Sequence, residues 1–273
     1  DLLIYSESYN GGKFEVTQKG RFNAYEYDIN SCYPYEIANL LDIRNAKVAH
    51  TPEYQDEAQY GFLRVKVNFM PPCYHPLSVK RGMLNTYPCG CFDRTITKAE
   101  YDYILTLGAE VEIEDAWWLK VTRKLYPYRK VVEDLYRRKA DLKGKDDMGY
   151  NIVKIMLNGF YGKMWQMVKQ PDGTIKAGCA WNPIYAAVIT ANARIRMSEI
   201  QNSLGKDCLA VHTDSVILCQ PFLDKVCFPN LGAWSLTAQG DTLIIGCGIY
   251  QIGDKVRIRG FPYDGKVDLF ELL

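Results

Sequence analysis

The chain is organised around one stretch, AYEYDINSCYP, which occupies residues 24–34. Its first half alternates, with aromatic and aliphatic side chains on one side and Glu26 and Asp28 on the other, which predicts a strand that ends at Asp28. Pro34 then stands where a helix can begin, because the first helical turn does not use the N–H group that proline lacks. We expect this helix to continue to Leu41. A strand that leads directly into a helix leaves the Asp28 carboxyl at the end of the strand.

Outward from this stretch, strands and helices are expected in a mixed order. Thr97 is a good N-cap and Glu100 completes a capping box with it, so a helix should begin there. Alternating or apolar runs predict strands at 61–69, 109–119, 208–211, 216–219, 242–252 and 255–260, and periodic runs predict helices at 97–107, 126–142, 150–165 and 182–204. Gly253 and Asp254 mark the turn of a final hairpin. The fold class is therefore α+β, with an antiparallel sheet backed by helices and a helical hairpin, residues 123–162, projecting from it.

Composition is typical of a soluble globular protein in the cytoplasm. Of the 273 residues, 48% are hydrophobic and 24% are charged. No apolar run is long enough to span a bilayer, and no basic-then-apolar signal segment begins the chain. Nine cysteines without framework spacing are expected to be reduced. Cys89 and Cys91, with Cys73 and His75 upstream, leave a zinc site open as an alternative, although their spacing matches no standard ligand pattern.

Positive charge is concentrated in one segment of the chain. Between residues 120 and 145 there are ten Lys or Arg residues and three Asp or Glu residues, whereas the whole chain has a net charge of +1. Proteins that bind polyanions often gather their positive charge in this way, and a solvated helix face is the alternative. If the segment binds DNA, its affinity should fall steeply with salt, because binding releases counterions.

A second aspartate lies at a position that matches Asp28. Asp214 belongs to the segment His212–Ser215, which separates two apolar runs and so forms the tip of a hairpin. If that hairpin adjoins the strand ending at Asp28, both carboxylates face one edge of the sheet. Two Mg²⁺ ions about 3.5–4 Å apart, held by such carboxylates, would activate a hydroxyl and stabilise a departing pyrophosphate. Single aspartates are also common at strand ends and in turns without any such function.

The helix after the basic segment carries a polar stripe. Tyr150, Lys154, Asn158 and Tyr161 recur at intervals of three or four residues and so share one face. A lysine there suits a triphosphate as a point charge, and Tyr161 can stack on a base or a sugar. Lys139, on the preceding basic helix, is the best second phosphate ligand. An ordinary exposed helix face is the alternative.

Together these segments resemble motifs of the family B DNA polymerases, in particular those of the protein-primed, phage-type branch. The segments that carry the resemblance are residues 28–34 to DxxSLYPS, 154–162 to KxxxNSxYG, 212–215 to the end of YxDTDS, 9–12 to YxGG, and 182–194 and 231–234 to the flanks of the last motif. In the family, YxGG joins the exonuclease and polymerase domains and touches the template. The motifs occur in the family's order and span residues 8–260.

The resemblance implies an architecture and a function together. Residues 1–122 and 163–273 would form the two parts of a palm, and residues 123–162 would form the fingers. The protein would be the core of a DNA-templated DNA polymerase that transfers dNMP to a primer 3′-hydroxyl with two Mg²⁺ ions, Mn²⁺ being an alternative. No exonuclease domain is expected before Tyr9, and most of a thumb is expected to be missing after Gly260.

The same resemblance implies the partners. These are primer–template DNA and dNTP, with a terminal protein or another replication factor as the further partner that the protein-primed branch suggests. The segment Gln166–Ala180 is short for an insertion that binds such a priming protein. No membrane is involved, and a phage-encoded copy would act in the cytoplasm of the bacterial host.

Roles for single residues also follow from the resemblance. Asp28 and Asp214 would be the catalytic metal ligands, together with the carbonyl oxygen of Ile29. Tyr33 would lie beneath the deoxyribose, where the 2′-hydroxyl of a ribose would clash. The nucleotide-binding residues would be Tyr33, Lys139, Lys154, Asn158 and Tyr161, and the DNA contacts would be Tyr9, Gly11, Gly12, Gly162, Thr213 and Tyr250.

Three departures from the motifs leave other functions open. His212 stands where the last motif has its first Asp, Gly159 replaces a serine, and the KxY motif that contacts primer is present only as residues 248–250, which lack the lysine. His212 and the missing thumb favour a non-catalytic, polymerase-like domain that binds nucleic acid as the alternative. Paired carboxylates also serve metal-dependent nucleases, but nuclease chemistry has no use for the stripe of Lys154 and Tyr161.

Overall fold

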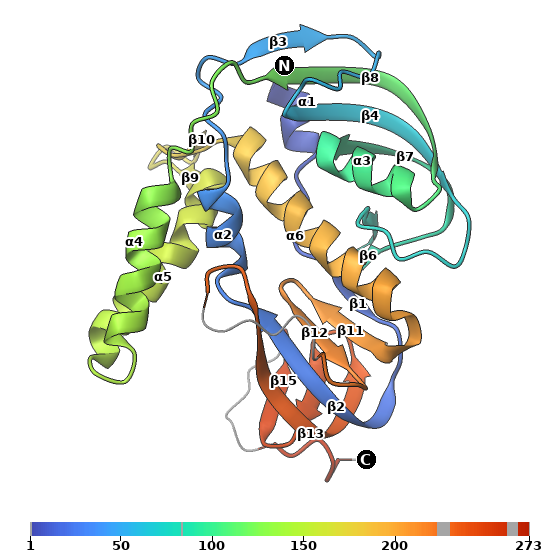
Figure 1. The fold of residues 1–273 in the computed structure, drawn as a ribbon, viewed down its shortest axis with the longest axis vertical. Helices are drawn as coiled ribbons and strands as arrows, with labels where there is room; N and C mark the ends of the chain where they lie inside the picture. The colour runs from blue at the N-terminus through green and yellow to red at the C-terminus, as the bar shows by residue number, and fades with distance from the viewer. Residues whose placement is uncertain (1, 83, 223–229, 261–266, 273) are drawn as a thin grey trace.

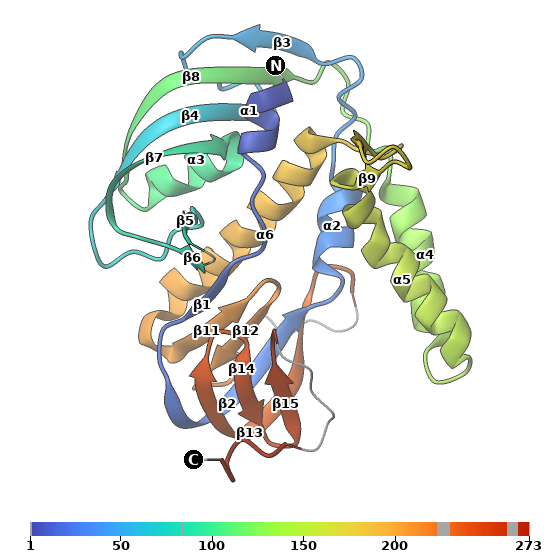
Figure 2. The same cartoon turned by 180° about the vertical axis from the view of Figure 1, so that it is seen from behind.

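Two large sheets, a long helix and a projecting helical hairpin organise the described part of the molecule (Figure 1). The structure is a computed structural model that describes residues 2–82, 84–222, 230–260 and 267–272. Helix α6, Pro183–Leu204, runs from the base of the hairpin past both sheets, as the view from behind also shows (Figure 2). This helix is therefore the element that joins the parts of the fold.

The larger sheet has β2, Gly20–Ile29, at its centre. Seven of the described strands form it in the order β1-β11-β12-β2-β13-β14-β15, and each pairing is antiparallel. The other strands are β1, Phe14–Val16; β11, Cys208–His212; β12, Ser215–Leu218; β13, Trp234–Gly246; β14, Ile249–Ile252; and β15, Lys255–Ile258. The strand expected to end near Asp28 is confirmed.

One expected strand is wrong. The run 242–252 is two strands that pair with each other, so that Thr242 lies opposite Ile252. The chain reverses at residues 246–248, where Gly248 has a φ of 75° that suits glycine. Apolar residues continue on both sides of this turn, and periodicity alone therefore does not reveal it. The final turn expected between β14 and β15 is confirmed.

The alternation within β2 decides what each face of the sheet meets. Tyr27 and Ile29 pack in a buried cluster with side chains of α6. Glu26 and Asp28 point to the opposite face and line a cavity there. Helix α2, Cys32–Ala38, follows β2 directly and both begins and ends earlier than expected.

The sequence patterns do not reveal that residues 47–120 form a sheet of their own. Four of the described strands pair in the order β3-β8-β4-β7, with the bounds Lys47–His50, Glu110–Lys120, Tyr60–Phe69 and Gly90–Thr97. Helix α3, Lys98–Thr106, packs against this sheet, and its expected capping box of Thr97 and Glu100 is confirmed. The expectation of one antiparallel sheet is therefore corrected to two, because alternation identifies strands but not the sheet that each one joins.

Smaller elements complete the half of the molecule around the second sheet. Helix α1, Leu2–Glu7, was not expected from the sequence, and its Ile4 and Tyr5 are buried. Strands β5, Val79–Arg81, and β6, Leu84–Thr86, form a short hairpin. A similar pair of strands, β9 at Met167–Lys169 and β10 at Ile175–Ala177, follows the helical hairpin.

The helical hairpin consists of α4, Arg129–Leu142, and α5, Asp147–Met164, and it projects from the body of the molecule (Figure 1). Helix α5 begins three residues before the expected Tyr150, because the Asp146 side chain accepts the Gly149 N–H group over 2.9 Å and caps it.

Only some of the apolar side chains of α5 are buried. Val153 and Leu157 are buried, but Ile152, Ile155 and Met156 are exposed. The hairpin therefore presents apolar as well as basic side chains to its surroundings.

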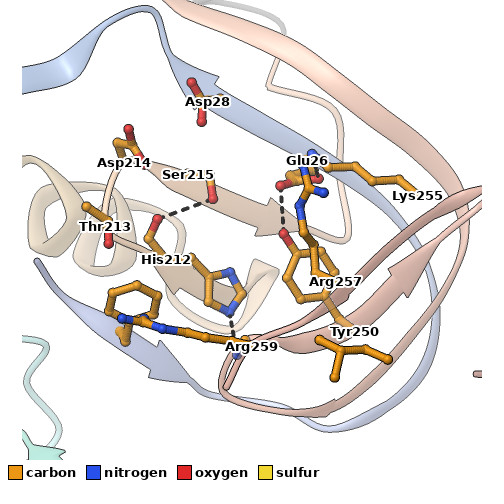
Figure 3. A pocket seen from close by; sticks show the side chains of 13 residues that line it. Glu26, Asp28, His212, Thr213, Asp214, Ser215, Tyr250, Lys255, Arg257 and Arg259 are labelled. Carbon is orange, nitrogen blue, oxygen red and sulfur yellow. Dashed lines mark hydrogen bonds and ion pairs between the residues drawn. The ribbon is translucent and has the colours of Figure 1, made fainter. Parts of the chain in front are cut away.

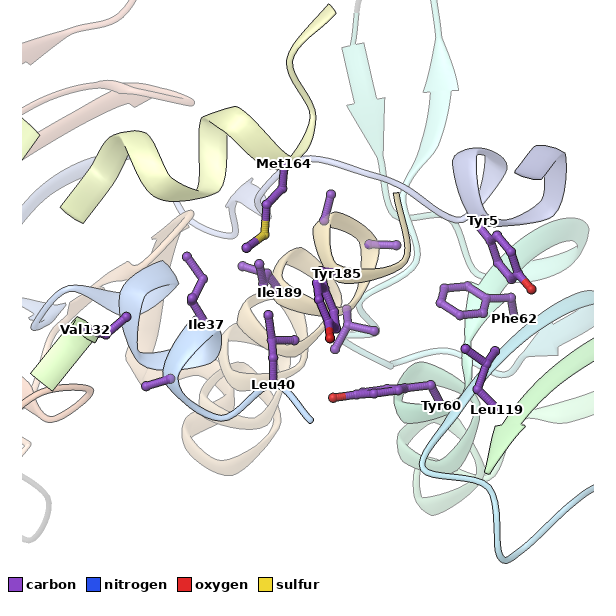
Figure 4. Close-up of a cluster of buried hydrophobic side chains, with 14 of the residues drawn as sticks. Tyr5, Ile37, Leu40, Tyr60, Phe62, Leu119, Val132, Met164, Tyr185 and Ile189 are labelled. Carbon is purple, nitrogen blue, oxygen red and sulfur yellow. The ribbon is translucent and has the colours of Figure 1, made fainter. Parts of the chain in front are cut away.

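One cluster of buried side chains anchors the hairpin to the rest of the fold (Figure 4). Val132 of α4 and Met164 of α5 belong to the same cluster as Ile37 of α2, Ile189 of α6 and Phe62 of β4. Burial of each such side chain contributes about 1.5–3 kcal/mol. The base of the hairpin is thus held firmly, although its tip projects.

Other expectations concern cysteines, metals and membranes. The cysteines that the structure describes are all free. Across the described ranges, no three His, Cys, Asp or Glu side chains gather where they could hold a metal ion, so the zinc alternative has no support. Cys89 and Cys91 are exposed, whereas His75 is buried against Phe69. No described helix is long and apolar enough to cross a membrane.

Candidate active site

The two aspartates singled out by the sequence lie at one edge of the larger sheet. Asp28 is in register with Ser215 of β12, and Asp214 occupies the turn between β11 and β12. The Ile29 N–H group donates to the Asp214 carbonyl oxygen over 2.8 Å. Both side chains line one cavity of about 410 Å³ (Figure 3). Neighbouring strands therefore bring together two carboxyls that are far apart in the sequence.

Left-handed backbone conformations flank both aspartates. Thr213 has a φ of 60° and Ser31 has a φ of 51°, values that are uncommon outside glycine and least favourable for a β-branched residue such as threonine. The Thr213 N–H group donates to the Lys13 carbonyl oxygen over 2.7 Å. A Cβ atom added at Gly12 would lie 2.7 Å from Thr213 Cγ2. Glycine at position 12 therefore lets the N-terminal segment pack directly against the turn that carries Asp214.

Both aspartates are partly buried, and the loss of solvation at their carboxyls exceeds what nearby cations offset. The pKa of Asp28 is raised to about 7, chiefly by burial and then by the charges of Asp214 and Glu26, while Lys255 and Lys139 offset part of this shift. Burial also raises the pKa of Asp214 to about 6. Two buried carboxylates that repel each other are stabilised by a cation between them. Their oxygen atoms are the ligands that Mg²⁺ and Mn²⁺ prefer, so the donor set fits such ions.

His212 supplies no negative charge to this site. Its ring stacks on Tyr250 with the ring centroids 4.9 Å apart, and Nε2 accepts the Gly248 N–H group over 3.3 Å. Burial, aided by the charges of Arg259 and Lys255, lowers the pKa of His212 to about 4, so the ring is neutral near pH 7. The proton then resides on Nδ1, which is buried and has no partner among the described residues.

Glu26 shares a face of β2 with Asp28 but has partners of its own. The Tyr250 hydroxyl donates to Glu26 Oε1 over 2.8 Å, and the Lys255 ammonium lies 2.5 Å from Oε2. Tyr250, for which a DNA contact stays a prediction, is only 4% exposed, and its hydroxyl is engaged by Glu26. The sequence motifs include neither Glu26 nor Lys255, although the alternation of β2 places Glu26 on the same face as Asp28.

The helical hairpin brings further cations near the aspartates. Lys139 of α4 donates to Ser31 Oγ over 2.9 Å. Burial lowers the pKa of Lys139, and the charge of Lys154 lowers it further, while Asp28 raises it. The two lysines expected to bind phosphate thus lie in one region, near an aspartate. Lys154 and Asn158 are exposed and so are accessible to a ligand.

Aromatic rings link the hairpin to the N-terminal segment. Tyr33 of α2 packs against Tyr161 of α5 with the ring centroids 4.5 Å apart, and Tyr9 stacks on Trp165 at 3.9 Å. The hydroxyls of Tyr9 and Tyr161 are in hydrogen-bonding contact. Tyr161 is therefore held in place by Tyr33 and Tyr9, and its stacking on a base or a sugar stays a prediction.

The remaining expected DNA contacts are of two kinds. The backbone at Gly11 is held by Arg194 of α6, whose Nη1 donates to the carbonyl oxygens of Asn10 and Gly11 over 2.6 and 2.9 Å. Arg194 in turn forms a buried ion pair of 2.5 Å with Glu100. Gly162, by contrast, has open space where a Cβ atom would stand.

Three cations at the end of the described sheet were not expected at the site. Lys255 and Arg257 of β15 line the cavity, as residues two apart on a strand share a face, and Arg259, which follows the strand, lines it too. The guanidinium of Arg259 lies over the ring of Phe14, which belongs to the far edge strand of the sheet. The available signal was this spacing of two, but the sequence does not show which face of the strand meets the aspartates.

Comparison with known sequences points to one family. The family model described as DNA polymerase type B, organellar and viral, matches residues 6–170. The DNA polymerase of Acidianus bottle-shaped virus is 26% identical over 287 residues, which cover 97% of this chain and 42% of that protein. A probable DNA polymerase of Ascobolus immersus is 25% identical over 173 residues, which cover 59% of this chain and 14% of that protein. The chain thus spans less than half the length of these curated relatives.

Solved structures agree on the fold. Phi29 DNA polymerase complexed with primer–template DNA and incoming nucleotide substrates matches 96% of this chain and 55% of that chain, with a TM-score of 0.74 and 15% identity. An orthorhombic crystal form of Phi29 DNA polymerase matches 91% and 49%, with a TM-score of 0.73 and 16% identity. At this level of identity the likeness establishes the fold alone.

Proposed function

The chain belongs to the type B DNA polymerases of the organellar and viral kind, and from this premise we propose that it is a DNA-templated DNA polymerase core. It transfers dNMP from a dNTP to the 3′-hydroxyl of a primer and releases pyrophosphate. Residues 1–122 and 163–273 are the palm, with the second sheet as a distinct part of the first segment, and residues 123–162 are the fingers.

The pair of Asp28 and Asp214 carries this proposal. Both line one cavity, and their raised pKa values are those of partly buried carboxylates whose loss of solvation nearby cations do not fully offset. With the Ile29 carbonyl oxygen, they would hold two Mg²⁺ or Mn²⁺ ions, which when bound activate the hydroxyl and stabilise the departing pyrophosphate. The left-handed residues Thr213 and Ser31 keep the two carboxyls at the edge of the sheet.

The hairpin supplies the nucleotide site. Lys154 binds the triphosphate, and Lys139, which is closer to the aspartates, binds it as a second cation. Asn158 completes the polar wall. Tyr33, packed against Tyr161, forms the floor beneath the sugar, where a 2′-hydroxyl meets the ring and is excluded by steric contact.

Primer–template DNA lies along the N-terminal motif and the turn that carries Asp214. Gly11, Gly12 and Thr213 form a continuous surface there, and Gly162 is open on the hairpin side. The basic segment 120–145 neutralises phosphates, so DNA affinity falls with salt. A terminal protein or another replication factor stays a prediction of the resemblance to the protein-primed branch.

Primer extension tests this function. A labelled primer annealed to a longer template is incubated with dNTPs and Mg²⁺ or Mn²⁺, and the products are resolved by length. We expect template-dependent extension by the parent protein and by Asp172→Asn, which alters an exposed aspartate outside the site. Asp214→Asn should extend no primer. If Asp214→Asn is as active as the parent, the two aspartates are not the catalytic pair.

His212 favours a second candidate, a polymerase-like domain that binds nucleic acid without catalysis. The neutral ring stands where the family motif has a carboxylate, so less negative charge is available to hold metal ions. Under this candidate, the parent binds primer–template DNA in fluorescence anisotropy but extends no primer with either metal. Gain of extension by His212→Asp would then identify the histidine as the cause.

A further inference from the structure

Positive charge lies on both sides of the aspartates. On one side, Lys139 of the hairpin bonds to Ser31, which follows Asp28 in the chain. On the other side, Lys255 of β15 pairs with Glu26, which precedes Asp28 along β2. The aspartates therefore separate two groups of cations. Because one group lies on each side of the aspartates, the two groups are suited to binding two different phosphate groups of the substrates rather than the same one.

The second group, Lys255 and Arg257 of β15 with Arg259 after it, contains guanidinium charge that pairs with no carboxylate among the described residues. Lys255, Arg257 and Arg259 face the cavity (Figure 3). Lys255 is paired with Glu26, but within the described ranges no carboxylate pairs with either arginine. Arg259 is nevertheless oriented, because its guanidinium carbon lies 3.7 Å from the centre of the Phe14 ring. An oriented cation without an anion at a cavity wall is prepared for an anionic ligand.

The turn between β13 and β14 makes room for Arg259. The Arg259 N–H group donates to the Gly248 carbonyl oxygen over 2.9 Å. A Cβ atom at Gly248 would lie 2.8 Å from Arg259 Cβ and 3.1 Å from its Cδ, so the arginine stem crosses the place where another side chain would stand. The Gly248 N–H group meanwhile bonds to His212. The turn at Gly248 therefore fixes the positions of both Arg259 and His212.

We propose that Arg259 binds the phosphodiester between the last two nucleotides of the primer and so positions the reacting 3′ end; this role rests on the proposed polymerase function. The triphosphate is taken by the hairpin cations, so the primer strand leaves the aspartates on the opposite side, where β15 lies. A planar guanidinium suits a phosphodiester because two N–H groups can bond to two oxygens at once. The carboxylate of Glu26 does not repel the strand there, since Lys255 neutralises it.

A primer with one neutral linkage tests this assignment. A methylphosphonate replaces the last phosphodiester of the primer and removes its charge, and affinity for primer–template DNA is measured by fluorescence anisotropy. With the normal primer, Arg259→Ala should bind about tenfold more weakly than the parent. The slope of log affinity against log salt should also decrease by about one. With the neutral linkage, Arg259→Ala should bind nearly as the parent does, because the contact is already absent.

Two further variants control for charge and for folding. Arg259→Lys keeps the charge and should retain part of the affinity, and Arg81→Ala removes an exposed arginine of β5 outside the cavity and should bind as the parent does. If Arg259→Ala fails to fold by circular dichroism, Arg259→Gln takes its place in the same comparison. Parent-like affinity for the normal primer, or an equal loss with both primers, would overturn the assignment.

Failure of this inference can be distinguished from failure of the polymerase function. If the parent extends primers while Arg259→Ala binds normal DNA as the parent does, only the role of Arg259 is wrong. If the parent neither binds primer–template DNA nor extends it, the polymerase function is wrong and this role with it. A positioning role also predicts that Arg259→Ala raises the DNA concentration needed for half-maximal extension more than it lowers the rate at saturating DNA.

Discussion

The aspartate edge, formed by Asp28 and Asp214, and the helical hairpin of α4 and α5 differ in how complete they are without a ligand. At the edge, strand register, the Ile29 amide and two left-handed residues hold partly buried carboxyls in place. On the hairpin, Lys154 and Asn158 are exposed, and only its base is anchored in a buried cluster. Under the proposed function, the difference teaches that the sheet positions its catalytic groups before substrate binds, whereas the hairpin side chains acquire their partners from the substrate.

The largest contrast should follow from removing one charge at the edge. Asp28→Asn should lower the rate of single-turnover primer extension by about a thousandfold, because a lost metal ligand removes several kcal/mol of transition-state stabilisation. DNA affinity, measured by anisotropy, should change little. A variant that extends primers at the parent rate would show that this edge is not where the chemistry occurs.

Removing a charge on the hairpin should affect nucleotide use instead. Lys154→Ala should raise the dNTP concentration for half-maximal extension about tenfold, the usual effect of losing a charge-assisted contact. Lys130→Ala, which alters an exposed lysine at the other end of the hairpin, should leave that concentration unchanged. Normal dNTP dependence with weakened duplex affinity in Lys154→Ala would make this lysine a contact to the DNA backbone, and the contrast with the edge would no longer hold.

Tyr33 lies where the two regions meet, and its effect should be smaller and confined to the sugar. Tyr33→Val should reduce the preference for dNTP over rNTP about tenfold, because the clash with a 2′-hydroxyl is relieved. Tyr33→Phe keeps the ring and should keep the preference. Single-nucleotide extension with both substrates measures this. If the parent accepts both equally, or if Tyr33→Val rejects rNTP as firmly as the parent, the sugar is tested elsewhere.

The smallest effect should be that of Asp28→Asn on stability. This substitution should lower activity but raise the free energy of unfolding of the metal-free protein. The folded pKa of Asp28 is raised from 3.8 to about 7, so the folded state binds this proton more tightly and loses stability as pH rises from about 4 to about 7. Asp28→Asn should therefore stabilise the metal-free protein by about 1–2 kcal/mol at pH 8 and by nothing at pH 4. Thermal unfolding in EDTA measures the difference.

Thermal unfolding of the parent and of Asp28→Asn can also be compared in the presence of metal ions. Mg²⁺ or Mn²⁺ should raise the melting temperature of the parent more than that of Asp28→Asn, because an ion that binds only the folded state stabilises it. Equal melting temperatures with and without metal in the parent would show that the carboxyls do not bind these ions.

Local patterns predicted the aspartate edge well, and long-range contacts account for most of the rest. The alternation around Asp28 and the polar tip at Asp214 are local signals. Strands β2, β11 and β12 lie where these signals predicted strands. The second sheet could not be predicted from local patterns. Its strands β3 and β8 pair although about 70 residues separate them in the sequence. The turn at Gly248 was hidden because apolar residues continue through it.

The partners of single side chains were harder to predict than elements. The hydroxyl of Tyr161 contacts that of Tyr9, which lies about 150 residues earlier in the chain. The hydroxyl of Tyr250 donates to Glu26, also from a distant strand. Each partner comes from a distant segment, so no pattern within a window of sequence contains the interaction. Arg259 was missed for the same reason, since its placement depends on the space beside Gly248.

The left-handed residues beside the aspartates also bear on any attempt to make the molecule more heat-resistant. A non-glycine residue in a sparsely populated backbone region costs about 1–3 kcal/mol, a sizeable part of the margin by which a domain stays folded. Glycine at Thr213 or Ser31 would relieve that cost and would also loosen the turns that aim the carboxyls. Thermal tolerance and turnover are therefore opposed at these positions. Substitutions meant to raise thermal stability should leave Thr213 and Ser31 unchanged and begin with exposed apolar positions such as Ile155.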